Sequence, residues 1–446
     1  MEKISQKRKE RRQRKRQKLK NRLLHRLPFT PLNIQGSLSG LDKDKQTVIV
    51  VCHEASRTGA PVLGLNMAAE MRKKYNVIVV LLERGDIYKE FVAVSDAVII
   101  QYCDPYMKHI FPKVVAKIQK ATNVAFAVVN SIASRNVLPA FYAAGIRSIM
   151  LVHEFAAYTA NKNEISQSID LAHKTIFSAG IIRDSSLEAC PEIDDDQYEV
   201  IPQGKCLLQL QYYGTESNYD TTEAAWVDKC FRPSGIDNKA FVIIGAGAVQ
   251  YRKGVDIFIH YAAEVMKRIN PDTMPIRFIW VGQGYDPQTD IGYSAFLEDQ
   301  VKRSGLEGYL EFAGELTNIK YAYKKADLMA ITSRLDPLPN VAIDAMHSKL
   351  PIICFDKTTG IADILKEEGL EKECIADYLD IASMAGKTLQ FINSPQHYDT
   401  VANKLKGIAS TTFNMDKYIS CLEQIALMDK ADAVRPSQQS TTEHDA

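Results

Sequence analysis

The sequence lacks any long apolar run. Its longest stretches, such as residues 77–82 and 149–152, fall far short of the ~18–20 residues of a membrane-spanning helix. The sequence also lacks a Cys-x-x-Cys pair, and its eight cysteines are scattered over 446 residues. This pattern excludes a small disulfide-stapled scaffold and indicates free thiols in a reducing cytoplasm. We therefore expect a cytoplasmic protein with no segment that spans a bilayer.

The sequence also lacks the spacing of common metal ligands. There is no His-x-x-x-His motif, and the acidic run Asp194-Asp195-Asp196 is interpreted as a solvated turn. We therefore expect no bound metal ion.

The composition is that of a folded globular protein. Hydrophobic residues make up 46% and charged residues 24% of the chain. At roughly 150 residues per domain, this length predicts two or three domains, each with its own core.

Basic residues are concentrated at one end. Residues 1–27 contain 13 Lys or Arg and 2 Glu, a net charge of +11, so the rest of the chain carries −10. No apolar segment of 7–15 residues follows, and the stretch is therefore not interpreted as a secretory signal. We expect residues 1–45 to form a disordered or loosely helical basic arm and residues 431–446, rich in Ser, Thr and Gln, to form a disordered tail.

Between these ends, short apolar runs alternate with helical patterns in two series. Such runs indicate parallel strands buried on both faces, so the sequence predicts an α/β protein with two doubly wound, Rossmann-like domains facing across a cleft. The expected domains are residues 46–204 and 205–400, followed by C-terminal helices at 401–430. Expected strands are residues 47–52, 77–82, 97–100, 124–130, 148–153, 175–178 and 198–202 in the first domain, and 241–245, 276–282, 310–313, 328–332 and 351–355 in the second. Expected helices include residues 60–75, 255–269, 293–304, 341–350, 381–392 and 415–428.

The first candidate site follows the strand at 241–245. A dinucleotide-binding G-x-G-x-x-G loop starting at Gly245 would need glycine at position 250, where Gln250 stands, so nicotinamide or flavin binding is disfavoured. Arg252 and Lys253 lie at the entry to a helix, where cations and backbone N–H groups can converge on phosphate. The alternative is a solvated basic turn.

The second candidate site is the segment from Thr332 to Met346. It runs from a strand end through a proline-stiffened loop into a helix, with Asp336 in the loop and Asp344 in the first turns of the helix. One carboxylate can face a sugar while the other accepts hydrogen bonds from ribose hydroxyls. The alternative is an ordinary loop acid and a favourable charge near a helix N-terminus.

Together these two segments resemble the family 4 glycosyltransferases of the GT-B fold. The resemblance covers roughly residues 47–430 and includes glycine turns at residues 201–204, 281–284 and 312–314. The chain departs from the family pattern at three positions, because Asp336 and Asp344 replace the usual glutamates and Ala248 stands where an arginine is usual.

The resemblance implies roles for individual residues. Arg252 and Lys253, beside Gly247, would bind the donor diphosphate, and Asp344 would bind the ribose. The remaining implied positions are Asp336, Pro339, Asn340 and His153 at the transferred sugar, and Arg57, Thr58 and Gly59 in an acceptor-side loop.

The implied function is retaining transfer of a sugar from a UDP- or GDP-linked donor, without a further cofactor. The acceptor would be a hydroxyl of a glycan, a lipid-linked glycan or a protein. Two alternatives stay open, namely a nucleotide-sugar epimerase or hydrolase of the same fold and a non-catalytic binding protein.

The basic arm generates a prediction about membranes. It has no aromatic residue before position 28, which disfavours single-stranded nucleic acid as its partner. Each Lys or Arg near an anionic bilayer contributes ~1 kcal/mol, and Leu19, Leu23 and Leu27 form a short apolar stripe at helical spacing. We expect the full chain to co-sediment with anionic vesicles at low salt and a shortened chain beginning at Pro31 to stay in the supernatant. Equal binding by both chains would remove this role from the arm.

Overall fold

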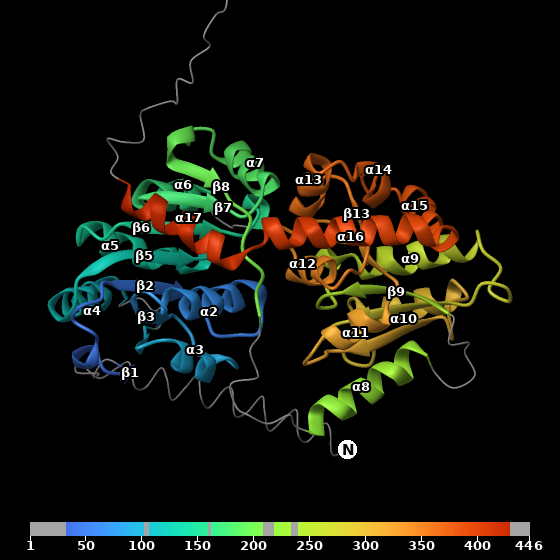
Figure 1. Cartoon of the computed structure of the whole chain (residues 1–446), viewed down its shortest axis with the longest axis horizontal. Coiled ribbons are helices and arrows are strands. Elements are labelled where there is room, and N and C mark those ends of the chain that lie inside the picture. Colours follow the sequence, from blue (N-terminus) through green and yellow to red (C-terminus); the bar gives the residue numbers. More distant parts are fainter. Residues whose placement is uncertain (1–32, 102–106, 159–161, 208–217, 233–239, 429–446) are drawn as a thin grey trace, which may run out of the picture.

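The computed structural model describes residues 33–101, 107–158, 162–207, 218–232 and 240–428. These residues form two α/β domains, each built on one sheet with helices on both of its faces (Figure 1). The predicted fold class is therefore confirmed. Within the described ranges, no helix is both long enough and apolar enough to cross a membrane.

The first domain contains an eight-stranded sheet. Its strands follow the order β1-β4-β3-β2-β5-β6-β7-β8, and all neighbours are parallel except β1 and β4. The strands are β1 (Asn33–Gly36), β2 (Thr47–Cys52), β3 (Asn76–Leu81), β4 (Ala97–Ile100), β5 (Val124–Asn130), β6 (Ser148–Val152), β7 (Lys174–Phe177) and β8 (Tyr198–Val200). The helices are α2 (Gly59–Met71), α3 (Tyr88–Val94), α4 (Met107–Ala121), α5 (Leu138–Ala143), α6 (Asn163–Leu171) and α7 (Gly180–Ala189).

The second domain contains a six-stranded parallel sheet in the order β11-β10-β9-β12-β13-β14. Its strands are β9 (Phe241–Ala246), β10 (Ile276–Val281), β11 (Leu310–Gly314), β12 (Leu328–Ile331), β13 (Ile352–Phe355) and β14 (Ile375–Ala376). The helices are α8 (Asn218–Phe231), α9 (Val255–Met266), α10 (Ser294–Arg303), α11 (Lys320–Lys325), α12 (Asn340–His347), α13 (Gly360–Glu367), α14 (Glu371–Cys374) and α15 (Ile381–Asn393).

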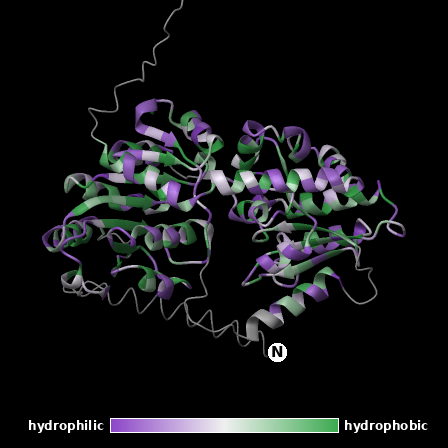
Figure 2. Ribbon diagram, viewed as in Figure 1, coloured by the Kyte–Doolittle hydropathy of each residue, from purple (hydrophilic) through white to green (hydrophobic). Residues whose placement is uncertain are grey.

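The strands carry apolar side chains on both faces because both faces are covered. In β2, Ile49 and Val51 belong to one core cluster, whereas Val48 and Val50 belong to the cluster on the opposite face. Figure 2 shows hydrophobic residues along the central strands and a mixture of hydrophobic and hydrophilic residues on the surrounding helices.

The last two helices connect the domains. Helix α16 (Pro395–Thr412) packs on α12 of the second domain, and α17 (Met415–Leu427) packs on α2, β5 and β6 of the first (Figure 1). Asn414, between them, caps α17 by accepting a hydrogen bond from the Lys417 backbone N–H at 2.9 Å. The segment after β8, which includes Gln203 and Lys205 and leads from the first domain to the second, is called the crossing segment. It lies against the end of α16, because the Lys205 N–H donates to the Phe413 carbonyl at 2.8 Å.

One segment differs from the sequence prediction. The disordered arm was predicted to reach residue 45, but Asn33–Gly36 form β1 at the edge of the first sheet, antiparallel to β4. Beyond it, the buried Asn76 side chain donates to the carbonyls of Asp42 and Lys45. The strand escaped prediction because Ile34 is its only apolar residue, so it has no alternating pattern. Residues 1–32 and 429–446 lie outside the described residues.

The end of α12 generates a stability prediction. Lys349 is exposed and has a left-handed φ of 60°, while the next residue, Leu350, donates its N–H back to the Ala345 carbonyl at 3.0 Å. Glycine adopts this conformation without the steric penalty of a Cβ atom. We expect Lys349→Gly to stabilise the protein by ~0.5–1 kcal/mol, measured as an increase in melting temperature.

Lys406, exposed in the middle of α16, provides the matched control. Lys406→Gly is expected to lower stability by ~1 kcal/mol, because glycine is unfavourable inside a helix. A decrease in melting temperature for both variants would contradict the prediction.

Candidate functional site

Strand order locates the candidate site in each domain. The order reverses between β2 and β5 in the first sheet and between β9 and β12 in the second, and ligands of doubly wound sheets bind beyond the carboxyl ends of strands at such points. Arg57, Thr58 and Gly59 follow β2, whereas the two segments singled out in the second domain follow β9 and β12. The topology therefore places these predicted residues at the two reversal points.

The two carboxyl edges contact each other. Gln203 Nε2 donates to Asn340 Oδ1 at 2.5 Å, and Arg57 Nη2 donates to the Thr317 carbonyl at 3.5 Å. A Cβ atom added to Gly360, after β13, would lie 2.2 Å from the Cβ of Ala179, after β7. We call the surface between these contacts the interdomain face.

The loop after β9 is shaped by glycine. Gly254 has φ 65° and joins the short 3-10 turn η6 (Tyr251–Lys253) to α9; a Cβ atom there would lie 1.9 Å from the Thr332 carbonyl oxygen. Gly247 has φ 144°, and the Lys253 side chain packs across it. The loop therefore needs glycine at both positions to keep Lys253 next to the segment that follows β12.

Three predicted residues form one ionic cluster. The buried Asp336 accepts from Lys253 Nζ at 2.5 Å through one carboxylate oxygen and from Arg252 Nη1 at 3.2 Å through the other. The Lys253 side chain is 12% exposed and the Arg252 side chain 40% exposed. Lys253 is thus fixed by the carboxylate, while much of the Arg252 guanidinium remains accessible to an anion.

Arg334, which was not predicted, holds the two loops together. Its guanidinium forms a bidentate pair with Asp256 at 2.9 and 2.7 Å and donates to the Tyr251 carbonyl, while its backbone N–H donates to the Arg252 carbonyl. Asp256 also accepts from the Tyr293 hydroxyl at 2.8 Å. Arg334 lies inside the segment from Thr332 to Met346, but nothing in the sequence indicates that it points toward α9.

Asp344 lies apart from that cluster. Burial raises its pKa to about 6, against the opposing effect of Lys205 and Lys320, the cations that act on it electrostatically. Among the described residues, no side chain or backbone group donates a hydrogen bond to its carboxylate. Asp344 is therefore a desolvated acceptor with nearby positive charge, which suits a hydroxyl donor. Neither Lys205 nor Lys320 belongs to a motif that the sequence analysis used as a site.

Pro339 and Asn340 begin α12. Pro339 is the N-cap residue, and Asn340 is the first helical residue, whose amide oxygen is bound by Gln203 of the crossing segment. A Cβ atom on Gly59 would lie 3.5 Å from Asn340 Nδ2. These two predicted residues thus lie where the first domain, the crossing segment and α12 meet.

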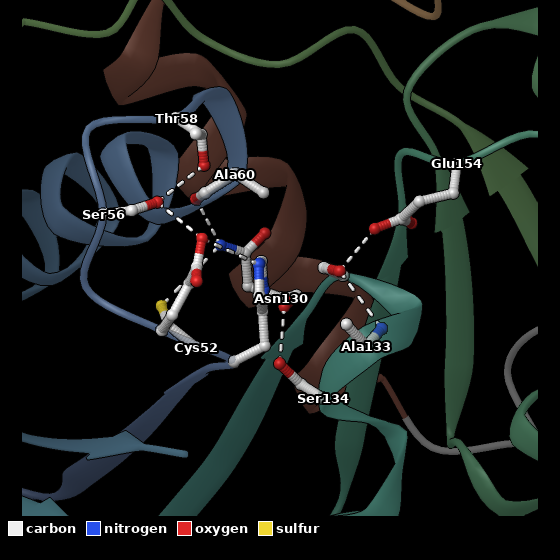
Figure 3. Close-up of polar contacts among 11 residues, drawn as sticks. Cys52, Ser56, Thr58, Ala60, Asn130, Ala133, Ser134 and Glu154 are labelled. Atoms are coloured by element: carbon white, nitrogen blue, oxygen red, sulfur yellow. Dashed lines mark hydrogen bonds and ion pairs between the residues drawn. The ribbon is translucent and has the colours of Figure 1, made fainter. Parts of the chain in front are cut away.

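The predicted acceptor-side loop contains a chain of hydroxyl groups (Figure 3). Ser56 Oγ donates to Glu54 Oε1 at 2.6 Å and lies 2.9 Å from Thr58 Oγ1. Thr58 is the N-cap residue of α2, which begins at Gly59. The loop therefore presents neutral hydroxyls beside one carboxylate, with Arg57 reaching toward the second domain.

His153 directly follows β6 and is linked to residues that the sequence analysis missed. Its Nε2 lies 2.9 Å from Asn130 Oδ1, and its backbone N–H donates to Glu154 Oε2 at 3.0 Å. Burial lowers the pKa of His153, opposed by Glu154 and reinforced by His53. Glu154 also accepts from the Ser131 hydroxyl and from the Ile132 N–H, so it fixes the turn after β5 (Figure 3). A buried asparagine at a strand end was the only available signal for Asn130.

Comparisons with known proteins find glycosyltransferases among the sequences similar to this chain. Residues 238–394 match the family model described as Glycosyl transferases group 1. A segment of 102 residues is 33% identical to the amylovoran biosynthesis glycosyltransferase AmsD of Erwinia amylovora, covering 23% of this chain and 28% of that protein. A segment of 127 residues is 30% identical to the alpha-galactosylglucosyldiacylglycerol synthase of Streptococcus pneumoniae, covering 27% of this chain and 30% of that protein.

A solved structure matches over both domains. The Anabaena protein HepE, crystallised in complex with UDP and glucose, aligns with a TM-score of 0.66 at 18% identity over 84% of this chain and 98% of its own. The predicted GT-B fold and the predicted family resemblance are confirmed. The chain spans about three tenths of the length of the two curated relatives above.

Asp344 generates a prediction about pH. Its folded-state pKa of about 6 lies above the ordinary value of 3.8, so its ionisation destabilises the folded protein as the pH rises through this interval. Asp344→Asn removes that effect. Between pH 4 and pH 8, the free energy of unfolding of the variant should rise by up to ~3 kcal/mol relative to that of the unmodified chain. This is measured as a pH-dependent difference in melting temperature.

Asp399, which is exposed on α16, provides the control substitution Asp399→Asn. Its melting temperature should follow that of the unmodified chain at both pH values. The same difference between Asp344→Asn and the unmodified chain at pH 4 and pH 8 would show that Asp344 is not desolvated.

Proposed function

Because residues 238–394 match the family model described as Glycosyl transferases group 1, we propose that this chain is a retaining glycosyltransferase that uses a nucleotide sugar. The sugar passes to a hydroxyl of a glycan, a lipid-linked glycan or a protein. The observation that carries the proposal is the pair of cations, Arg252 and Lys253, held on Asp336 at the point where the strand order of the second sheet reverses. The UDP in the HepE structure supports a UDP-linked donor, and a GDP-linked donor is the alternative.

In this proposal the cationic cluster binds the donor diphosphate. Among the described residues, Arg252 donates a side-chain hydrogen bond only to Asp336, and only through Nη1, so its other N–H groups can bind phosphate oxygens. Gly247 lets the Lys253 side chain lie close to the loop backbone beneath that position. Charge on the departing diphosphate is then stabilised by fixed cations without a metal ion.

The other predicted residues surround the rest of the donor. Asp344 accepts from the ribose hydroxyls, while Asp336, Pro339 and Asn340 line the sugar from the second domain and His153 from the first. During transfer, the bond from the anomeric carbon to the diphosphate oxygen breaks and a bond to the acceptor oxygen forms on the same face. The acceptor proton passes to the leaving diphosphate, so the reaction needs no further cofactor.

A lipid-linked acceptor fits the charge distribution best. The arm of residues 1–27 carries +11, which would hold the enzyme on the anionic cytoplasmic face of a membrane as a peripheral protein. The Streptococcus relative is named as a synthase of a glycosylated diacylglycerol. The acceptor would then enter beside Arg57, Thr58 and Gly59.

The function is tested by incubating the full chain with UDP- and GDP-linked sugars, with and without lipid-linked and free glycan acceptors, and analysing all products. Transfer that depends on an acceptor and persists in EDTA supports the proposal. Conversion of the donor alone would indicate an epimerase or hydrolase, and donor binding without turnover would indicate a binding protein. Loss of transfer in EDTA that Mg²⁺ restores would overturn metal independence.

Two substitutions test the donor site. Lys253→Ala removes a charge-assisted hydrogen bond to the diphosphate, and Asp344→Ala removes the acceptor for the ribose. Each bond contributes on the order of 1.5–3 kcal/mol, so we expect a tenfold to hundredfold weaker affinity for the nucleotide sugar by calorimetry.

Lys267, a 71% exposed lysine on the surface after α9, provides the matched control. Lys267→Ala should bind the donor like the unmodified chain. Unchanged affinity in both Lys253→Ala and Asp344→Ala would rule out this donor site.

A further inference from the structure

The Asn130 side chain is held in one orientation by its neighbours. Its amide nitrogen donates to the Ala60 carbonyl at 2.6 Å and lies 3.7 Å from Cys52 Sγ (Figure 3). A Cβ atom at residue 64 would lie 3.0 Å from this nitrogen, so Gly64 lets α2 approach it. Because the nitrogen faces these groups, the oxygen of the fully buried amide must face His153.

That orientation determines where His153 carries its proton. Asn130 Oδ1 can only accept, so the His153 Nε2 atom 2.9 Å away must be the N–H donor. In a neutral imidazole the other ring nitrogen then carries a lone pair. His153 Nδ1 is buried and has no hydrogen-bond partner among the described residues.

The surroundings of His153 favour the neutral ring. Both oxygens of Glu154 are occupied by the Ser131 hydroxyl and by backbone N–H groups, and the ring itself contacts the uncharged Asn130 amide. A histidine that takes up a proton during catalysis is commonly backed by a carboxylate that stabilises the imidazolium. This arrangement provides a fixed acceptor instead of an acid or a base.

Strand order places His153 at the carboxyl edge of the first sheet, which contacts the second domain. The strands follow one another as β2-β5-β6-β7, and His153 follows β6. On one side, Gly59 after β2 lies next to Asn340, and on the other, Ala179 after β7 lies against Gly360. His153 therefore lies between two contacts with the second domain.

We propose that Asn130 is a positioning residue that keeps His153 as the Nε2–H tautomer, so that Nδ1 accepts a hydrogen bond from a sugar hydroxyl. The inference rests on the proposed function and adds a selectivity to it. A lone pair cannot bind a phosphate or carboxylate oxygen, since both accept only. The position therefore selects a hydroxyl and rejects a sugar in which that hydroxyl is replaced by hydrogen or fluorine.

The tautomer is tested first, without any need for activity. Ring ¹⁵N signals of the labelled full chain are recorded at pH 8, and the His153 signals are identified by their loss in His153→Gln. We expect a protonated Nε2 and a bare Nδ1 in the unmodified chain, a mixture of tautomers in Asn130→Ala, and recovery of the Nε2–H form in Asn130→Asp, which keeps an acceptor. An unchanged spectrum in Asn130→Ala would overturn the positioning role.

The selectivity is tested with deoxy and deoxyfluoro donor sugars. The unmodified chain should lose about tenfold in kcat/KM for the analogue altered at one hydroxyl, and Asn130→Ala should lose that discrimination. Asn76, also buried, lies at the opposite end of the same sheet and is hydrogen-bonded to Asp42 and Lys45; it provides the control Asn76→Ala. This control should keep the discrimination even if it lowers stability.

The two ideas fail in different ways. Transfer activity with no effect of Asn130→Ala on discrimination would reject the positioning role and leave the transferase intact. Absence of transfer with every donor, together with the expected tautomer pattern, would reject the proposed reaction but retain the His153 acceptor.

Discussion

The buried Asp336 carboxylate is the interaction on which the second domain's site depends. At 5% exposure it would be costly to leave without partners, and Lys253 and Arg252 each take one of its oxygens. The two cations come from the loop after β9 and the acid from the loop after β12. Lys253 and Arg252 lie 83 and 84 positions before Asp336 in the chain, so these ion pairs fix the position of one loop relative to the other.

The pair does not act alone, because neutral and ionic bonds beside it restrict the same loops. Arg334 binds Asp256 at the start of α9, while Thr332 Oγ1 donates to the Gly254 carbonyl at 2.9 Å. The Asp336 N–H donates to the Thr358 carbonyl, which ties the loop to the segment after β13. Asp336, a shorter acid than the glutamate usual in the family pattern, lies within hydrogen-bond distance of both cations.

Much of the fold could be predicted from the sequence because its strands are buried on both faces. Such strands appear as continuous apolar runs, and the predicted ranges 47–52, 97–100 and 124–130 coincide with β2, β4 and β5. The edge strands β1 and β14 lack this signal, since they are short and Asn33–Gly36 has one apolar residue. Their formation depends on a neighbouring strand that offers free backbone groups, which is a tertiary property.

The candidate site likewise contains residues that the sequence could predict and residues that only the tertiary structure brings together. Arg252, Lys253, Asp336 and Asp344 could be selected because they lie in short segments that resemble a known family. Asn130, by contrast, lies 23 positions from His153, and Arg334 lies 78 positions from Asp256. Their contacts arise from strand order and from α2 folding back over β5. No local pattern contains that information.

The two domains present chemically different surfaces to the same face. The second domain offers guanidinium and ammonium groups on a shared carboxylate, which favours an anion such as a diphosphate. The first domain offers the hydroxyls of Ser56 and Thr58 beside the Glu54 carboxylate, together with the buried Nδ1 of His153, which has no hydrogen-bond partner among the described residues. A nucleotide sugar has the same polarity along its length, with a charged diphosphate joined to a neutral polyhydroxyl ring. A ligand of this kind would satisfy both surfaces only in one direction, with its sugar toward β5 and β6. Asn130 would then keep His153 Nδ1 as a hydrogen-bond acceptor at the sugar end, while Asp336 holds the cations in position at the phosphate end.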